Sequence, residues 1–217
     1  IEVRKILGVP LENTEDLRHS EIAIYDHFVE YKLKNKSEDE ILAFFEPIAR
    51  GVFDWLKDVK PDVVYSLAYQ GGHPEHDIVS AFAGLAAKRL AAVQSREIKL
   101  VHLPEYEFTI LIPMRFKPWY KGEILSIQLT PDELDKKFRV MQAYPSQVEL
   151  FDKFKKVMNG LGKVSWLVGK KFSWEEFGAK ETFGPTPLDF DYLKNPHLFE
   201  LENYMMDKHK NIQIEFK

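Results

Sequence analysis

The sequence predicts an α/β protein, with a mostly parallel sheet and helices on both of its faces. Residues 63–68 (VVYSLA) form a short apolar run rich in β-branched residues, which is typical of a strand buried in a parallel sheet. Segments with helical spacing of apolar residues precede and follow this run. The order of strand, loop and helix is the pattern of an α/β domain, and we expect residues 63–68 to form its central strand.

The first half of the chain predicts two helices before that strand. Residues 1–7 have helical spacing, and Gly8 follows where a C-terminal cap belongs. Because no N-cap precedes this helix, we expect the natural chain to have further sequence before Ile1. Ser37 and Glu40 form a capping box that opens a helix running to about residue 57, and Pro47 should kink it or mark a short break.

The elements expected after residue 68 continue the alternation. A helix follows residues 69–77, with apolar residues from Ile78 to Leu90 on one face. Three strands are expected at residues 98–103, 107–113 and 123–129, separated by Pro and Gly turns. Thr130 and Glu133 predict another capped helix, and a further helix covers about residues 146–158. Beyond Gly160 the pattern weakens, except for a strand-like segment at residues 212–216.

The composition limits the classes of function. The 217 residues carry 34 acidic and 30 basic side chains, a net charge of −4, without the basic stripe that nucleic-acid binding requires. No run of 18 apolar residues exists, so the sequence predicts no membrane span and a cytoplasmic location; any signal peptide would lie before Ile1. Because there is no cysteine, a metal would have to be held by His, Asp or Glu.

The segment GGHPEHD carries the candidate site, between the expected strand at 63–68 and the helix after it. Ligands bind at this edge in open α/β sheets. His73 and His76 are three residues apart, Pro74 stiffens the turn, and both imidazoles could ligate a metal, donate to an oxyanion or shuttle a proton. Residue types alone leave open the alternative that both histidines are solvated or cap the helix.

Three segments resemble, in order, the LmbE/PIG-L family of zinc-dependent N-deacetylases. Residues 71–90 (GGHPEHDIVSAFAGLAAKRL) are similar to the family's second block, GHPDH followed by a helix. Residues 5–9 (KILGV) are similar to the end of a helix that precedes the middle strand. A later block, with a Lys followed by a Ser-Gln pair, is matched by Lys137, Val140, Tyr144, Ser146 and Gln147. Glu181-Thr182-Phe183 resembles a Glu-x-Phe near the family's C-terminus, a weaker match.

This resemblance implies a Rossmann-like fold and a catalytic zinc ion. By position, His76 would be the third metal ligand, and His73 would hydrogen-bond the oxyanion that develops on the substrate. Zinc held by three protein ligands keeps an open position, lowers the pKa of its bound water to about 7 and polarises a carbonyl. In the family, an N-terminal HPDDE-like block supplies the other two ligands and an Asp that acts as general base.

The sequence departs from the family at that block, because no HPDD-like segment occurs in the 217 residues. We therefore expect the chain to lack a first βαβ portion of the fold. Residues 1–158 would be the N-terminally incomplete deacetylase domain, and residues 159–217 a C-terminal extension packed on it. The Asp26-His27 pair and residues 207–209 (DKH) are too isolated to replace the block, and we expect them on the surface.

Other side chains are weaker candidates. Arg115, Trp119 and Tyr120 could stack on a sugar ring and bind its hydroxyls, or simply cover an edge or an oligomer contact; Trp166 and Trp174 are weaker still. Asp77 could cap the helix or support a ligating His from the second layer. His102 lies within an apolar strand and is expected to be a core or edge histidine.

The resemblance thus predicts hydrolysis of the N-acetyl group of an N-acetylglucosamine-like sugar. The expected partners are a small amino-sugar substrate and zinc, and the sequence also allows association of identical chains. The alternative is a non-catalytic member of the same fold that binds a sugar or a partner without zinc. A serine hydrolase is disfavoured because the sequence has no G-x-S-x-G elbow.

Overall fold

The computed structural model describes residues 2–32, 35–68, 74–104, 122–163 and 173–186. It contains a four-stranded sheet with the order β1-β2-β4-β3. The strands are β1 (Val63–Leu67), β2 (Lys99–Leu103), β3 (Leu125–Gln128) and β4 (Lys180–Thr186). β1 pairs with β2 in parallel, and β2 pairs with β4 in antiparallel fashion. The α/β class is therefore confirmed, with a sheet that mixes both kinds of pairing.

β1 lies at one end of the described sheet, so the expectation of a central strand at residues 63–68 is wrong for this part of the chain. The pattern of burial along the strand explains why the sequence predicted a central position for it. Val64 and Ser66 are buried on one face, whereas Tyr65 on the opposite face is 63% exposed. An apolar run is typical of a strand covered on both sides, but it does not report how many neighbours the strand has.

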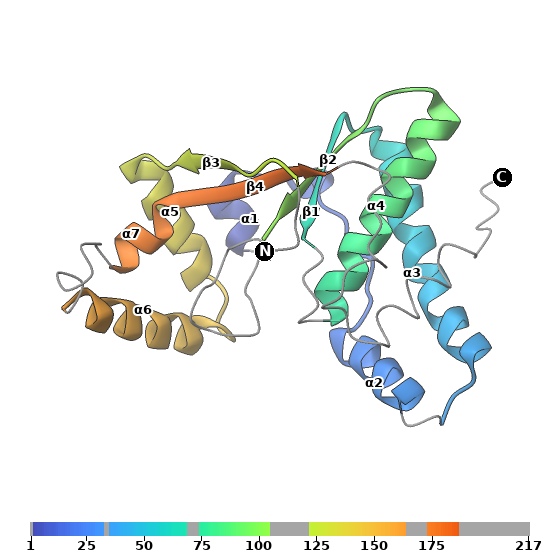
Figure 1. The fold of residues 1–217 in the computed structure, drawn as a ribbon, viewed down its shortest axis with the longest axis horizontal. Helices are drawn as coiled ribbons and strands as arrows, with labels where there is room; N and C mark the ends of the chain where they lie inside the picture. Colours follow the sequence, from blue (N-terminus) through green and yellow to red (C-terminus); the bar gives the residue numbers. More distant parts are fainter. Residues whose placement is uncertain (1, 33–34, 69–73, 105–121, 164–172, 187–217) are drawn as a thin grey trace. The chain divides into compact units, whose positions relative to one another are not determined.

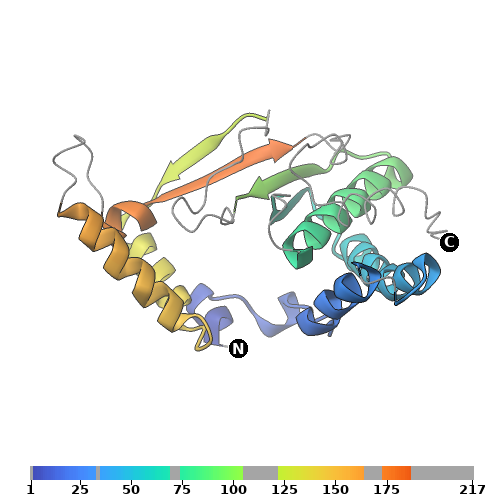
Figure 2. The same ribbon diagram turned by 60° about the horizontal axis from the view of Figure 1, so that its bottom comes forward.

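By its internal contacts the chain divides into two units, and Asp16–Leu125 with Thr182–Lys217 form the larger one. Its helices are α2 (Glu21–Lys32), α3 (Glu38–Val59) and α4 (Pro74–Gln94). α4 packs on β1 and β2 and runs beside α3, as Figures 1 and 2 show. Ala83, Ala86 and Ala87 lie in the core against Val64 and Leu100, because small side chains let a helix approach the sheet closely.

The capping box that opens α3 is confirmed. The Ser37 Oγ accepts a hydrogen bond from the Glu40 backbone N–H, and the Glu40 carboxylate accepts one from the Ser37 backbone. α3 then continues as one helix through Pro47, so the expected break is absent from this described helix. The buried side chains of this helix include Phe45, Ile48, Phe53 and Leu56.

Arg96 ties together the turns at the amino ends of β1 and β2. Its Nη1 donates to the Lys60 carbonyl at 3.0 Å, and its Nη2 donates to the Pro61 carbonyl at 2.6 Å and to the Asp62 carboxylate at 2.8 Å. Lys60 ends α3 in the left-handed conformation, with φ of 53°. This end of the two strands is therefore closed by protein groups, and their carboxyl ends lie at the other edge.

The smaller unit comprises Ile1–Glu15 and Ser126–Glu181. Its helical segments are α1 (Glu2–Leu7), η1 (Leu11–Asn13), α5 (Pro131–Gln142), α6 (Val148–Gly162) and α7 (Trp174–Gly178). Gly8 ends α1 with φ of 71°, and Thr130 and Glu133 form the predicted capping box of α5. Trp174, 6% exposed, stacks between Phe138 and Phe177.

Several elements differ from the expectations or lie outside the described residues. The sequence pattern did not identify α2, α7 or β4. The strands expected at residues 107–113 and 212–216 lie outside the described residues. The division of the chain at residues 158 and 159 stays a prediction; α6 continues to Gly162, and β4 hydrogen-bonds to β2.

Among the described residues, no helix combines the length and the apolar character that a membrane span requires.

Candidate functional site

The carboxyl ends of β1 and β2 lie at the same edge of the sheet, because the two strands are parallel. The Ala68 backbone N–H donates to the Leu103 carbonyl at 2.8 Å, so the chain leaves both strands at adjacent points. Residues 69–73 follow β1, and residues 105–121 follow β2 and Pro104. Arg115, Trp119, Tyr120 and His73 lie in these two segments, outside the described residues. The two segments that contain the predicted site residues therefore begin next to each other, at one edge of the sheet.

His76 lies in the first turn of α4, which begins at Pro74 only seven residues after the end of β1. Its side chain is partly buried. The free N–H groups at a helix N-terminus favour negative charge nearby, such as a carboxylate or a developing oxyanion. Asp77 belongs to the same turn, but its side chain lies outside the described set. His76 therefore lies at the start of a helix, nine residues after the end of β1, and its role as a ligand stays a prediction.

Ser80 is one helical turn after His76 and was not singled out by the sequence. Its side chain is 0% exposed, and its Oγ has no hydrogen-bond partner among the described residues. Residues 76, 80, 83 and 87 fall on one stripe of α4 by helical spacing. Ala83 and Ala87 of that stripe are core residues. The sequence around Ser80 could not identify this hydroxyl, because its burial and its lack of a hydrogen-bond partner depend on the three-dimensional structure.

The described residues contain no group of three His, Cys, Asp or Glu side chains that could hold a metal ion. Of the predicted ligands, they contain His76. A histidine at this edge fits one corner of a tetrahedral zinc site, and the buried, unpaired Ser80 hydroxyl gives the same stripe a polar group that the apolar core does not use. Two further donors are needed to complete a catalytic site.

His102 lies deeper in the same unit and is confirmed as a core histidine. It is 2% exposed, and its Nδ1 is 3.0 Å from the Thr186 Oγ1. Burial lowers the pKa of His102 from 6.5 to about 4, so the ring is neutral at neutral pH. Ser66 is its register partner on β1. The contact between His102 and Thr186 joins the side chains of β2 and β4.

Four other residues singled out in the sequence, namely Lys137, Glu181, Trp174 and His27, make contacts that the structure describes. Lys137 forms an ion pair of 2.7 Å with Glu181 and donates to the Gly178 carbonyl, so these two motif residues fasten α5 to the start of β4. Trp174 is buried between aromatic rings, which corrects the interpretation that it could stack on a sugar. His27 is also not a plain surface residue, because its ring stacks on Phe44 at 3.5 Å between centroids.

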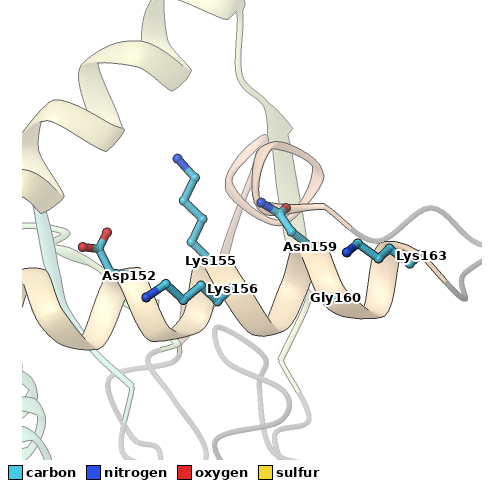
Figure 3. Close-up of a pocket in the computed structure, with 6 residues that line it drawn as sticks. All are labelled: Asp152, Lys155, Lys156, Asn159, Gly160 and Lys163. Atoms are coloured by element: carbon cyan, nitrogen blue, oxygen red, sulfur yellow. The ribbon is translucent and has the colours of Figure 1, made fainter.

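A pocket lies beside α6 in the smaller unit, and Figure 3 shows the residues that line it. Its lining residues are Asp152, Lys155, Lys156, Asn159, Gly160 and Lys163. The Asn159 side chain accepts a hydrogen bond from the Trp174 backbone and so supports α7. None of the predicted site residues lines this pocket, and its lysines are exposed side chains of one helix.

No family model matches the chain, and no curated protein matches its sequence. Three solved structures are similar to its fold. The zinc-inhibited form of teicoplanin deacetylase Orf2 has a TM-score of 0.46 and 13% identity, over 85% of this chain and 70% of that one. A deacetylase of teicoplanin biosynthesis bound to bog has a TM-score of 0.42 and 15% identity, over 80% of this chain and 57% of that one.

The deacetylase–teicoplanin complex has a TM-score of 0.38 and 16% identity, over 79% of this chain and 54% of that one. The chain therefore spans little more than half the length of two of these structures.

Proposed function

We propose that this chain is part of a zinc-dependent N-deacetylase that hydrolyses the N-acetyl group of an amino sugar. The observation that carries the proposal is that the second half of the GGHPEHD block, residues 74–77, forms the first turn of α4, which begins seven residues after the carboxyl end of parallel strand β1. Strand-to-helix junctions at this edge are where α/β proteins bind ligands. The three family-like segments, in the family's order, support the same activity.

Each residue would have a distinct role in this reaction. When bound, zinc supplies a Lewis acid that activates water and polarises the amide carbonyl. His76 would hold the metal through a neutral imidazole nitrogen, and His73 would donate a hydrogen bond to the amide oxygen as negative charge builds on it. Arg115, Trp119 and Tyr120, which follow β2, would orient the sugar. The general base and two further ligands would come from an HPDDE-like block.

The test is a pair of variants in the full-length protein, His76→Ala and His73→Ala, assayed for bound zinc and for acetate released from N-acetylglucosamine derivatives. We expect His76→Ala to lose both properties. We expect His73→Ala to retain its zinc, while kcat falls by roughly 10²- to 10³-fold, the usual effect of losing one oxyanion donor.

The exposed His19 provides the matched control, and His19→Ala should keep both the metal and the activity. A His76→Ala protein with a full complement of zinc would contradict the assignment of the ligand. A wild-type protein that binds the sugar, contains no metal and releases no acetate would favour the non-catalytic alternative.

A further inference from the structure

We propose that Ser80 is a positioning residue that holds the imidazole of His76 in its metal-binding orientation. This inference rests on the proposed function, because it requires His76 to be a ligand. Ser80 would touch neither the substrate nor the metal. Its hydroxyl would accept a hydrogen bond from the ring N–H of His76 that faces away from the metal, directly or through one water molecule.

The spacing of the two residues allows this contact. Positions i and i+4 of an α-helix lie on one face, about 5–6 Å apart between Cβ atoms. α4 is continuous from Pro74 to Gln94, so His76 and Ser80 keep this relation. A serine hydroxyl has lone pairs to accept the imidazole proton, and one bridging water can span any remaining gap.

Ser80 is unfavourable for the stability of the folded chain. Its Oγ is buried without a hydrogen-bond partner among the described residues, a state that destabilises a folded protein. Ala83 and Ala87 further along the stripe show that alanine suits this face of α4. Packing alone would thus be satisfied better by alanine at position 80. The hydroxyl gains a partner if the His76 ring turns to bind a metal.

Metal-bound histidines need such a partner. A ligating imidazole almost always donates its second ring N–H to a protein or water acceptor, which fixes its tautomer and orientation. Loss of that acceptor typically weakens metal binding by about 10- to 100-fold. Ser80 is buried in the same helix as His76, and its hydroxyl could be this acceptor.

The experiment measures two properties of full-length Ser80→Ala: zinc affinity, by competition with a chromophoric chelator, and the melting temperature of the metal-free protein. We expect zinc affinity to fall by about 10- to 100-fold. We expect the melting temperature of the metal-free protein to stay the same or rise, because an unsatisfied hydroxyl has been removed. Ser80→Thr, which keeps a hydroxyl, should retain more of the affinity than Ser80→Ala.

Ser66→Ala is the matched control in the same core. Ser66 is 7% exposed, and its hydroxyl already donates to the Leu67 carbonyl at 3.3 Å. The control should lower the melting temperature and leave zinc affinity unchanged, the opposite of the result expected at Ser80. This reversal separates a positioning role from a merely structural one.

Two outcomes would overturn the inference alone: wild-type zinc affinity in Ser80→Ala, or a parallel loss of affinity and of metal-free stability. The first would leave the hydroxyl as a buried group without a role, and the second would make it structural. A wild-type protein that binds no zinc would overturn the proposed function and the inference with it, so the two failures are distinguishable.

Discussion

His102 shows how one buried side chain makes stability depend on pH. Its ring is 2% exposed and its pKa is about 4, lowered by burial, against 6.5 for the ordinary group. Below pH 6.5 the unfolded chain takes up a proton that the folded chain refuses. Stability is therefore unaffected by this group above pH 6.5 and falls as the pH drops from 6.5 towards 4.

We expect this single histidine to remove about 3 kcal/mol of unfolding free energy between pH 6.5 and pH 4. Because carboxylates also titrate in the lower part of that range, the measurement is the difference between wild type and His102→Gln in urea unfolding at each pH. The wild-type curve should fall more steeply. Parallel curves would contradict the prediction, and the variant's uniform loss of the Thr186 contact would not mimic it.

His102, His27 and Ser80 show for which side chains the sequence predicts the surroundings and for which it does not. The role of His102 as a core residue could be predicted, because its neighbours in residues 98–103 are apolar. His27 was misplaced because the ring of Phe44, which covers it, comes from another helix. Ser80 was missed for the same reason, since nothing in the surrounding sequence reports that its hydroxyl is unpaired.

Among the elements, α5 and α7 depend on a close approach at one glycine. A Cβ added to Gly178 would lie 2.6 Å from the Phe138 ring and 3.0 Å from Leu134. Phe138 is itself stacked on Trp174, so its ring cannot move freely. Gly160 on α6 is the contrasting case, because a Cβ there would meet nothing within 4 Å.

Gly178→Ala and Gly160→Ala should therefore change stability in opposite directions. The first forces the aromatic stack apart and should cost about 1–3 kcal/mol. The second removes backbone freedom from the unfolded chain inside a helix and should stabilise by about 0.5–1 kcal/mol. Urea unfolding of the two variants beside wild type measures both, and equal effects would show that the packing at Gly178 is looser than it is in the structure.

Local elements were predictable where their signals are local. The capping boxes of α3 and α5, the glycine cap of α1 and the two parallel strands all follow from a few adjacent residues. β4 was missed because Gly184 and Pro185 interrupt its pattern, although Gly184 lies opposite His102 in the sheet. Its place between β2 and β3 is fixed by pairing with distant segments, which periodicity does not encode.

At the scale of the whole molecule, the same division applies to the site. The order of elements predicted a loop containing His76 between the carboxyl end of a strand and a helix. The structure has that strand and that helix, but the helix begins at Pro74 and so includes His76. The sequence could not show that the carboxyl ends of β1 and β2 are neighbours. The hydrogen bond from the Ala68 backbone N–H to the Leu103 carbonyl shows this in the structure. That contact depends on the register of strands more than 30 residues apart.

Metal binding at this edge would also stabilise the whole folded chain, because zinc that binds only the native state shifts the unfolding equilibrium. At a free zinc concentration 100 times the Kd, the gain is about 2.7 kcal/mol. For a chain of this size, that corresponds to roughly 5–10 °C in melting temperature. Addition of a chelator to the zinc-loaded protein should therefore lower its melting temperature by this amount, and restoring zinc should reverse the change. His76→Ala should melt at one temperature with or without the chelator. A wild-type protein indifferent to the chelator would show that no zinc is bound by the native fold.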